Sequence, residues 1–435
     1  MIYYISNKGN DRADGLTPET AWRTTEALSR RIVGGDTVLL RCGDVFYGKI
    51  LLPNGIDTTH RTVLSSYGEG EKPKICLYKI VESEDAWELI APLIWRVDLT
   101  NTSLYTGNVY TEDTNVGFLY LNGEIHGDKC FSLADLRNYW QFYCEEQYVY
   151  VCSNRNPNTY ADKIFFAVDN GICLGNHCQI HGIDVYGGGC HGISGGVWDA
   201  VISQCDIHDF GGSHLLSDQR LHVRFGNGIE FWPGGGDITV ERNRIYNIYD
   251  VGVTMQGFPI PGKGWKNIVF DNNIFWGNEQ TFEIWTNNKE GGDGIRDCAF
   301  RNNRCLDAGR GWSHEVRPDK DAGVHLLLYA TLCEKHEVVV ENNIFADPRT
   351  ALYYKSFEEP DGKFPADYIT RRNRLYLRKD AYLVNRSYVY RAADFEVFTK
   401  ECQKEIDSRI YWITESDEPM QSERSTVSEG WNGGV

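Results

Sequence analysis

One asparagine recurs at a nearly fixed interval through the second half of the chain. These residues are Asn243, Asn273, Asn303, Asn343 and Asn373, separated by 30, 30, 40 and 30 residues. Apolar residues stand three positions before and two positions after most of them, as in VERNRIY and VFDNNIF. A repeat of this length predicts one structural unit stacked on copies of itself. Each Asn is expected at a tight corner, where it tolerates a left-handed backbone and hydrogen-bonds to the next Asn along the stack.

The segments between these asparagines favour β-strands over helices. They lack long apolar runs with helical periodicity and carry short β-branched and aromatic segments instead, such as GNGIEFW and TFEIWTNN. Coils of this length fit a right-handed parallel β-helix, in which strands stack about 4.8 Å apart and side chains alternate between core and solvent. We therefore expect an all-β solenoid.

The N-terminal segment carries a second set of motifs. They are a YYVS-type strand, a GND loop, a P-x-x-A-W turn, an amphipathic helix, a GDTV strand and a glycine corner, at Tyr3–Ser6, Gly9–Asp11, Pro18–Thr24, Glu26–Ile32, Gly35–Val38 and Gly43–Gly48. This segment closely resembles the start of pectate-lyase-like, right-handed β-helix carbohydrate-active proteins, which include β-helix glycoside hydrolases. The resemblance implies that the helix caps the first coil. It leaves the activity open, because such coils carry lyases, hydrolases, epimerases and phage tailspikes.

Breaks in the repeat predict four regions. We expect an N-terminal cap with the first coils, an inserted β-rich lobe, the main coils that carry the site, and a C-terminal cap with a tail. Their expected ranges are 1–84, 85–166, 167–377 and 378–435. The lobe is expected to contain two hairpins, FLYLNGEIH and QYVYVCS, around a short helical piece. The amphipathic stretch FEVFTKECQKEI is expected to cover the C-terminal end.

Charge and composition exclude several classes of partner. The net charge of −17 argues against nucleic-acid binding and disfavours a polyanionic glycan. No segment is apolar enough to span a membrane, and MIYYISNKGND has no signal-peptide pattern, so we expect a cytoplasmic protein or a secreted one whose signal peptide has been removed. The 13 cysteines include no CxxC, which favours reduced thiols over disulfides or zinc. We expect no metal and no cofactor, and the oligomeric state stays open.

The strand before each Asn corner supplies the candidate site. Aligning Phe282 with Val324 and with Leu352 as core residues leaves two outward rows. The first row is Ser194, Glu230, Thr254, Glu283, His325 and Tyr353, and the second is Trp232, Gln256, Trp285, Leu327 and Lys355. Outward tryptophans beside carboxylates predict sugar recognition, because an indole ring stacks on the C–H face of a pyranose while polar groups bind its hydroxyls.

Paired carboxylates in these rows predict the hydrolysis of a glycosidic bond. Glu230 and Glu283 are expected two strands apart, with Cβ atoms about 9–10 Å apart. Side chains that lean together would approach the roughly 6.5–9.5 Å separation of inverting glycosidases. Asp250, at the corner of the coil between them, would supply the closer pair of about 5–5.5 Å that retaining enzymes use. One carboxyl would be a general acid with a raised pKa beside the indole rings, and its partner a base or nucleophile.

Polar loops beside these coils are expected to wall a cleft. One loop carries His222 and Arg224, and RGWSHEVRPDKDAG carries Trp312 and Arg317. We expect these four residues to bind substrate together with His325, Thr254, Gln256, Trp232 and Trp285.

Three functions remain open. The first is a glycoside hydrolase that cleaves oligo- or polysaccharides. The second is a polysaccharide lyase, whose base would be His325, Tyr353, Lys355 or Arg317. The third is a non-catalytic glycan-binding adhesin or tailspike-like protein. The acidic face disfavours a lyase, and no obvious trimerisation stretch supports an adhesin, so the sequence favours the hydrolase.

Overall fold

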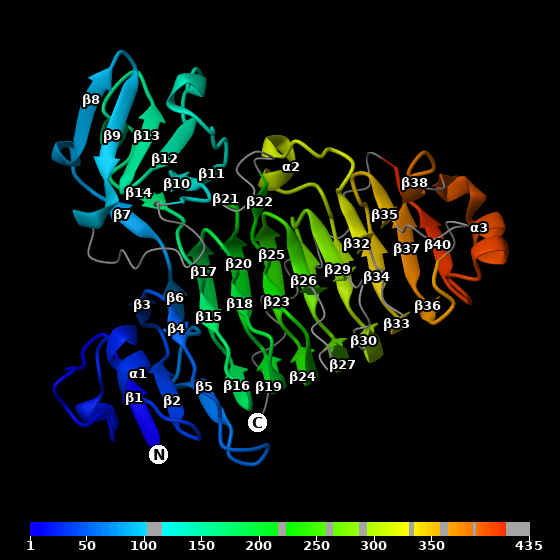
Figure 1. The fold of residues 1–435 in the computed structure, drawn as a ribbon, viewed down its shortest axis with the longest axis horizontal. Coiled ribbons are helices and arrows are strands. Elements are labelled where there is room, and N and C mark those ends of the chain that lie inside the picture. Colours follow the sequence, from blue (N-terminus) through cyan, green and yellow to red (C-terminus); the bar gives the residue numbers. More distant parts are fainter. Residues whose placement is uncertain are drawn as a thin grey trace.

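The protein is a right-handed parallel β-helix with a β-rich lobe beside its N-terminal half (Figure 1). The computed structural model describes residues 1–101, 115–215, 223–257, 264–286, 294–329, 335–356, 364–385 and 389–414. Three sheets of ten strands each run along the helix, and each main coil adds one strand to every sheet. The predicted all-β solenoid is confirmed.

The three sheets, named here A, B and C, are given in spatial order. Sheet A contains β1 (Ile2–Ile5), β2 (Thr37–Arg41), β5 (Thr62–Tyr67), β16 (Cys178–His181), β19 (Trp198–Ser203), β24 (Gly235–Glu241), β27 (Trp265–Asp271), β30 (Ile295–Arg301), β33 (His336–Glu341) and β36 (Tyr368–Arg371). Sheet B contains β3 (Val45–Tyr47), β6 (Lys74–Cys76), β17 (Asp184–Gly188), β20 (Asp206–Phe210), β25 (Arg244–Ile248), β28 (Ile274–Trp276), β31 (Arg304–Leu306), β34 (Ile344–Ala346), β37 (Arg374–Leu377) and β40 (Arg409–Trp412). Sheet C contains β4 (Ile50–Leu51), β15 (Ile172–Cys173), β18 (Ile193–Ser194), β23 (Ile229–Phe231), β26 (Val251–Gly257), β29 (Gln280–Thr286), β32 (Val324–Tyr329), β35 (Ala351–Ser356), β38 (Tyr382–Asn385) and β39 (Tyr390–Arg391).

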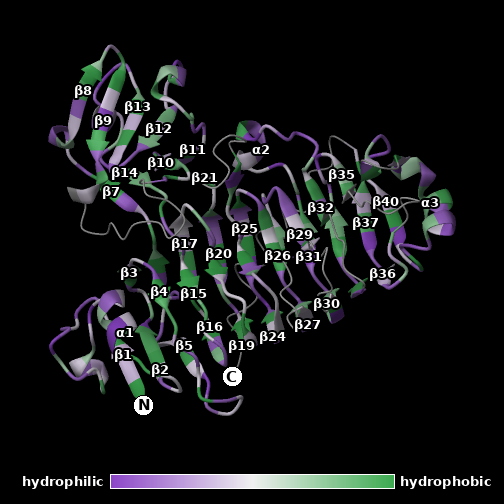
Figure 2. Cartoon of the chain, in the orientation of Figure 1, coloured by the Kyte–Doolittle hydropathy of each residue, from purple (hydrophilic) through white to green (hydrophobic). Residues whose placement is uncertain are grey.

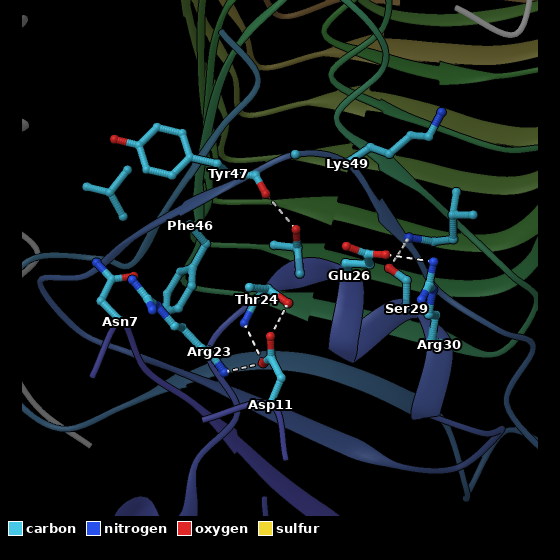
Figure 3. A pocket seen from close by; sticks show the side chains of 14 residues that line it. Asn7, Asp11, Arg23, Thr24, Glu26, Ser29, Arg30, Phe46, Tyr47 and Lys49 are labelled. Atoms are coloured by element: carbon cyan, nitrogen blue, oxygen red, sulfur yellow. Dashed lines mark hydrogen bonds and ion pairs between the residues drawn. The ribbon is translucent and has the colours of Figure 1, made fainter. Parts of the chain in front are cut away.

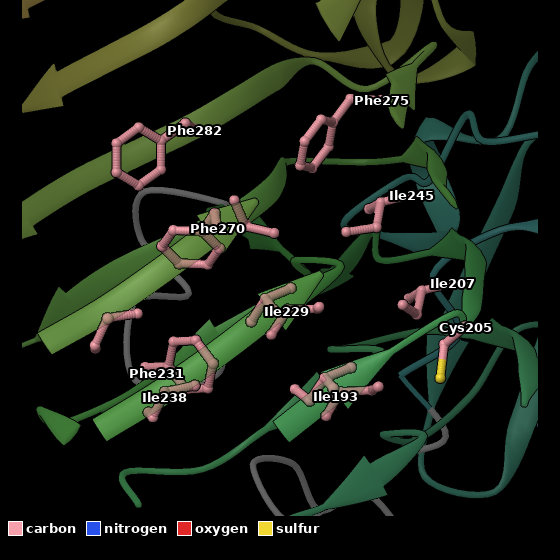
Figure 4. Close-up of a cluster of buried hydrophobic side chains, with 14 of the residues drawn as sticks. Ile193, Cys205, Ile207, Ile229, Phe231, Ile238, Ile245, Phe270, Phe275 and Phe282 are labelled. Atoms are coloured by element: carbon pink, nitrogen blue, oxygen red, sulfur yellow. The ribbon is translucent and has the colours of Figure 1, made fainter. Parts of the chain in front are cut away.

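A single core runs the length of the helix. Hydrophobic and hydrophilic residues alternate along the strands (Figure 2), and the inward residues of all three sheets form one buried cluster. In sheet C the inward row passes through Ile193, Ile229, Val253 and Phe282 on successive coils. Figure 4 shows part of this core, where phenylalanines and isoleucines of neighbouring coils pack together. Because each coil buries its apolar face only against its neighbours, stability is shared along the stack.

The recurring asparagines form the expected ladder inside the stack. The side-chain Nδ2 of Asn243 donates to Oδ1 of Asn273 at 3.0 Å, and the same bond continues to Asn303, Asn343 and Asn373 at 3.1–3.2 Å. From Asn273 onward, each Oδ1 also accepts the backbone N–H of the preceding ladder Asn. These bonds satisfy polar groups that the dry interior would otherwise leave unpaired.

The residue with left-handed backbone at each corner is not the ladder asparagine, as the sequence predicted, but the residue before it. Positive φ angles of 54–58° occur at the residue just before each ladder Asn, and these residues are Arg242, Asn272, Asn302, Asn342 and Arg372. The ladder asparagines turn their side chains inward instead, because the exposed corner is made by the preceding residue.

Both ends of the helix carry a short α-helix. α1 (Thr25–Arg31) begins at Thr24, whose Oγ1 accepts the backbone N–H of Ala27, and it buries Ala27 and Leu28 against the first coils. α3 (Phe395–Cys402) packs Phe398 against Tyr353 near the last coils. Among the described residues, no helix is both long and apolar enough to cross a membrane.

The inserted lobe contains two antiparallel sheets of four strands each. The first orders β11 (Glu124–His126), β10 (Leu119–Leu121), β14 (Ile164–Phe166) and β7 (Lys79–Val81), and the second β12 (Phe142–Glu145), β13 (Tyr148–Cys152), β9 (Ile94–Asp98) and β8 (Trp87–Ala91). Both predicted hairpins occur, as β10–β11 and β12–β13. A third hairpin, β21 (Ser213–His214) with β22 (Arg224–Phe225), and the helix α2 (Trp312–Val316) lie where the lobe meets the main coils (Figure 1).

Candidate active site on sheet C

The outer face of sheet C carries the candidate site. The strand register sets Ser194, Glu230, Thr254 and Glu283 on successive coils, so that the two glutamates stand two strands apart. Stacking at about 4.8 Å per coil separates the Cβ atoms of Glu230 and Glu283 by about 10 Å. The two carboxylates therefore face the same strip of surface with Thr254 between them.

Glu283 lies in an environment that favours its protonated form. Its side chain is 7% exposed, and the hydroxyl of Thr254 donates to Oε2 at 2.8 Å. Burial, followed by the negative charges of Asp250 and Glu230, raises the pKa of Glu283 to about 8, although the Thr254 hydrogen bond acts in the opposite direction. This environment favours the protonated form of Glu283 at neutral pH.

Glu230 is buried like Glu283 but is surrounded by hydrogen-bond donors. Gln256 Nε2 donates to Oε1 at 2.6 Å, Asn227 Nδ2 approaches the same oxygen at 3.5 Å, and His191 Nε2 lies 3.0 Å from Oε2. The backbone N–H of Asn227 donates to Nδ1 of His191 at 3.1 Å. Because Nδ1 accepts, the neutral ring carries its proton on Nε2 and donates it to Glu230. These donors suit a carboxylate.

His191 and Asn227 were missed in the sequence, although a signal for them exists. Both stand directly before a corner glycine and an inward isoleucine, in CHGIS and GNGIE. These segments pair in register on β18 and β23, so that the two polar side chains lie on neighbouring coils beside Glu230. A search for polar residues that precede repeated Gly-Ile pairs would have found them.

Asp250 joins the site from the corner before β26. Its Oδ1 lies 3.0 Å from Nη1 of Arg317, which also donates to the carbonyl of Tyr249, while Nη2 binds Asp319. Burial raises the pKa of Asp250, and the guanidinium of Arg317 lowers it. Arg317, which directly follows α2, thus contacts one of the three candidate carboxylates.

Two tryptophans form an aromatic surface beside the carboxylates. The rings of Trp232 and Trp285 stack with centroids 5.6 Å apart and planes 17° apart, across the coil that carries Gln256. Trp232 is 36% exposed, and Gln256, on the coil between the two tryptophans, donates to Glu230. An exposed indole next to buried carboxyl groups has the composition of a sugar-binding surface.

His325 and Tyr353 do not belong to the outer face, contrary to the sequence alignment. His325 is fully buried, with Nδ1 3.0 Å from Thr281 Oγ1 and Nε2 3.0 Å from the carbonyl oxygen of Ala346, and burial lowers its pKa to about 4. The hydroxyl of Tyr353 binds Glu405 inside the core. Neither side chain reaches the site.

The error for His325 comes from the corner at which each sheet C strand begins. Phe282 pairs with Leu326 rather than with Val324, so His325 lies level with Thr281. Earlier coils have glycine at this corner. At Gly228, for example, a Cβ atom would lie 2.5 Å from the carbonyl oxygen of the next coil. The corner position points inward, and the simple alternation of a strand fails there.

Arg224 and Trp312 hold the lobe in place rather than lining the face. Arg224 is buried and donates to the carbonyl oxygens of Gly212, Gly127 and Gly117, the last two from the lobe, at 2.7–2.9 Å. Trp312 packs on Phe118 of the lobe and donates to a main-chain carbonyl. Both were expected to bind substrate. His222 lies outside the described residues, as does the side chain of Lys355.

Comparison with known proteins identifies the fold. No protein-family model matches the chain, and no curated protein matches it. Among solved structures, pectate lyase Pel9A has a TM-score of 0.51 at 10% identity, with coverage of 97% of this chain and 84% of the other. XylC in complex with xylose has a TM-score of 0.44 at 11% identity, covering 94% and 83%. The GH136 lacto-N-biosidase from Eubacterium ramulus has a TM-score of 0.40 at 13% identity, covering 95% and 68%. The chain thus shares the right-handed parallel β-helix fold of the pectate lyase.

Proposed function

We propose that the protein is a glycoside hydrolase whose site is the strip of sheet C from Glu230 to Glu283. The observation that carries this proposal is the contrast between the two glutamates. Glu283 is buried with one hydroxyl donor and a pKa raised to about 8, whereas Glu230 is held by His191, Gln256 and Asn227. One buried carboxyl group with a raised pKa, facing a second that is surrounded by hydrogen-bond donors, resembles the acid and base pair that glycoside hydrolysis needs.

The roles follow from these environments. Glu283 gives its proton to the glycosidic oxygen as the bond to the leaving sugar breaks. Glu230 takes a proton from a water molecule as the water oxygen forms its bond to the anomeric carbon. The separation of two strands leaves room for this water, which supports inversion at the anomeric carbon. Asp250 helps to keep Glu283 protonated through its negative charge. The stacked Trp232 and Trp285 hold a sugar ring against the pair.

A polysaccharide lyase is the second candidate, because one solved structure that shares the fold is named a pectate lyase. A lyase needs a basic group to remove a proton next to a uronate carboxylate. His325 and Tyr353 lie in the core, and Arg317 is bonded to Asp250 and Asp319. The carboxylates of Glu230 and Asp250 would also repel the carboxylate of a uronate. The hydrolase is therefore the better-supported function.

A glycan panel distinguishes the two activities. Purified protein is incubated with xylan, arabinan, galactan, mixed-linkage glucan, pectin and alginate, and both new reducing ends and ultraviolet absorbance of unsaturated products are recorded. A hydrolase gives reducing ends without absorbance. Products that absorb in the ultraviolet would make the protein a lyase, and binding without any product would make it a glycan-binding protein.

The Trp pair provides a test of substrate binding. Trp232→Ala removes the exposed ring that stacks on Trp285 and is expected to raise KM about tenfold with a smaller effect on kcat, because an aromatic contact contributes about 1 kcal/mol beyond its buried area. Steady-state kinetics on the glycan identified by the panel measure this change. Trp412→Ala is the matched control, because Trp412 is 43% exposed on β40 of sheet B. Equal effects of both substitutions would contradict the assignment.

His191 is proposed as the positioning residue for Glu230. His191→Phe keeps a ring against Phe225, whose centroid lies 5.3 Å away, but removes the Nε2 proton. A hydrogen bond to a charged group is worth about 1.5–3 kcal/mol, so kcat is expected to fall roughly ten- to a hundredfold with little change in KM. His181→Phe is the control, because His181 lies half-buried on sheet A with a hydroxyl partner. A rise in KM alone would assign His191 to substrate binding.

A further inference from the structure

A hollow of about 1100 Å³ lies at the N-terminal end of the β-helix. It opens between α1 and the segment that runs from β3 to β4, as Figure 3 shows for Glu26, Ser29 and Arg30 on the helix and Tyr47 and Lys49 on the segment. No part of the proposed hydrolysis takes place there, because Glu230 and Glu283 do not line it.

One row of outward residues runs from this hollow to the strip of sheet C that carries Glu230 and Glu283. Leu51 lines the hollow and pairs with Cys173 of β15, which pairs with Ser194 of β18, which pairs with Glu230 of β23. Leu51 thus stands three coils, or about 14 Å, from Glu230 in the same outward row. Cys173 and Ser194 are small and half-buried. No large side chain therefore stands on this row between Leu51 and Glu230.

A second row connects the same two places along the corners of sheet C. Lys49, on the rim of the hollow, makes an ion pair of 3.2 Å with Asp169. Asp169 is followed on the next coils by Cys190, Gly226 and Asp250, linked by backbone contacts from coil to coil. Because Cys190 and Gly226 are buried, this second row joins the two places beneath the surface, and the surface that they share is the row from Leu51 to Glu230.

The lining of the hollow has the chemistry of a sugar-binding surface. Tyr47 is 43% exposed and Leu51 is 48% exposed, which gives apolar surface for the C–H face of a pyranose. Glu26 and Arg30 form an exposed ion pair at 2.7 Å, and Arg23 adds a second guanidinium. Planar groups of this kind bind pairs of neighbouring hydroxyls. Cations and anions both occur, so a neutral glycan fits better than a strongly charged one.

We propose that this hollow is a distant subsite that binds the far end of the glycan chain whose bond is cut between Glu230 and Glu283. The inference rests on the proposed hydrolase function and adds a substrate class: a neutral oligo- or polysaccharide long enough to cover the three coils from Leu51 to Glu230. A disaccharide cannot reach both places.

The test compares short and long substrates. The neutral polysaccharide that gives reducing ends in the panel is partially hydrolysed and separated into size fractions, and kcat/KM is measured for each fraction. The wild type is expected to prefer long fractions to the disaccharide by at least about tenfold. Tyr47→Ala is expected to lower kcat/KM on the long fractions about tenfold and so bring the ratio of long to short toward one. Tyr139→Ala, at an exposed position of the lobe, is the control.

The outcomes separate this inference from the proposed function. If the wild type cuts long and short fractions equally well, or if Tyr47→Ala leaves their ratio unchanged, the distant subsite is wrong while the hydrolase assignment stands. If no fraction yields reducing ends, the hydrolase assignment is wrong, and the distant subsite, which depends on it, is wrong as well. Because Tyr47 is exposed and its backbone carbonyl oxygen, not its ring, binds Thr25, loss of folding is not expected. Circular dichroism of Tyr47→Ala and of a second variant, Arg23→Ala, checks this point.

Discussion

Glu283→Gln is expected to lower kcat about a thousandfold and to change KM little. General acid catalysis contributes 10²- to 10⁴-fold, or roughly three orders of magnitude. Glutamine keeps the size of the side chain and an oxygen for the Thr254 hydroxyl, but its amide has no proton acidic enough to transfer to the leaving oxygen. Wild-type kcat should also fall as the pH rises above about 8, because Glu283 loses its proton there. The residual activity of Glu283→Gln should lack this decline.

The matched control is Glu241→Gln. Glu241 ends β24 on the same coil as Glu230 but belongs to sheet A, away from the strip. It should retain wild-type kcat and the wild-type pH profile. Activity of Glu283→Gln within tenfold of wild type would show that another group protonates the leaving oxygen.

Glu283→Gln is also expected to change the stability of the protein, and the sign of the change follows from the raised pKa of Glu283. Glu283 keeps its proton in the folded state up to about pH 8 but would lose it near its ordinary value of 4.5 in the unfolded chain. Between these two pH values the folded state binds more protons, so the free energy of unfolding decreases as the pH rises. Glu283→Gln should remove this decrease and be more stable than wild type at pH 8. Urea unfolding at both ends of this pH window measures the difference.

Asn303→Ala is expected to be strongly destabilising while it leaves the candidate site untouched. Asn303 Oδ1 accepts the backbone N–H and the side chain of Asn273, and its Nδ2 donates to the carbonyl oxygen of Phe270 and to Asn343. Alanine leaves at least two of these buried groups unpaired, at about 1–3 kcal/mol each. The free energy of unfolding should fall by about 3 kcal/mol or more, which denaturant titration of the purified variants measures.

Asn138→Ala provides the comparison for the ladder. Asn138 is exposed in the lobe, so its substitution should change the free energy of unfolding by no more than about 0.5 kcal/mol. If Asn303→Ala were no worse than Asn138→Ala, the ladder would contribute nothing to stability and its regular spacing would need another reason.

The fold was predictable because one local pattern repeats in space as it repeats in sequence. The Asn interval and the short strands specify the stacked coils, and the N-terminal motifs point to the same architecture. The position of the left-handed residue was not predictable, because the segments read RN and NN at the corner and either residue tolerates positive φ. Only the inward direction of the ladder side chains decides between them.

The candidate site was predictable only where strand alternation holds. Glu230, Thr254 and Glu283 lie in the middle of sheet C strands and face outward in register. His325 lies at a strand start, where the chain turns a corner and the alternation is interrupted. The sequence alignment paired Phe282 with Val324, but in the structure Phe282 pairs with Leu326, two residues later. The loops between these strands differ in length, so the sequence does not show this shift. Sequence periodicity carries no information about such shifts, because a shift of two residues preserves the phase.

Contacts between distant segments were beyond sequence reasoning. Arg224 binds two carbonyl oxygens of the lobe about a hundred residues away, and Arg317 reaches Asp250 from beyond α2. Both arginines stand in polar loops of similar composition, so nothing local distinguishes the one that fastens the lobe from the one that contacts a candidate carboxylate.

The protonation state of Glu283 is the central claim of this account, and it can be measured without knowing the substrate. Infrared difference spectra between wild type and Glu283→Gln, recorded at increasing pH, report the C=O stretch of a protonated carboxyl group. We expect a band that is present in wild type at neutral pH, is absent in Glu283→Gln, and disappears with a midpoint near pH 8. A carboxyl band at Glu283 that disappears near pH 4.5 would mean that Glu283 is ionised at neutral pH and is not the general acid.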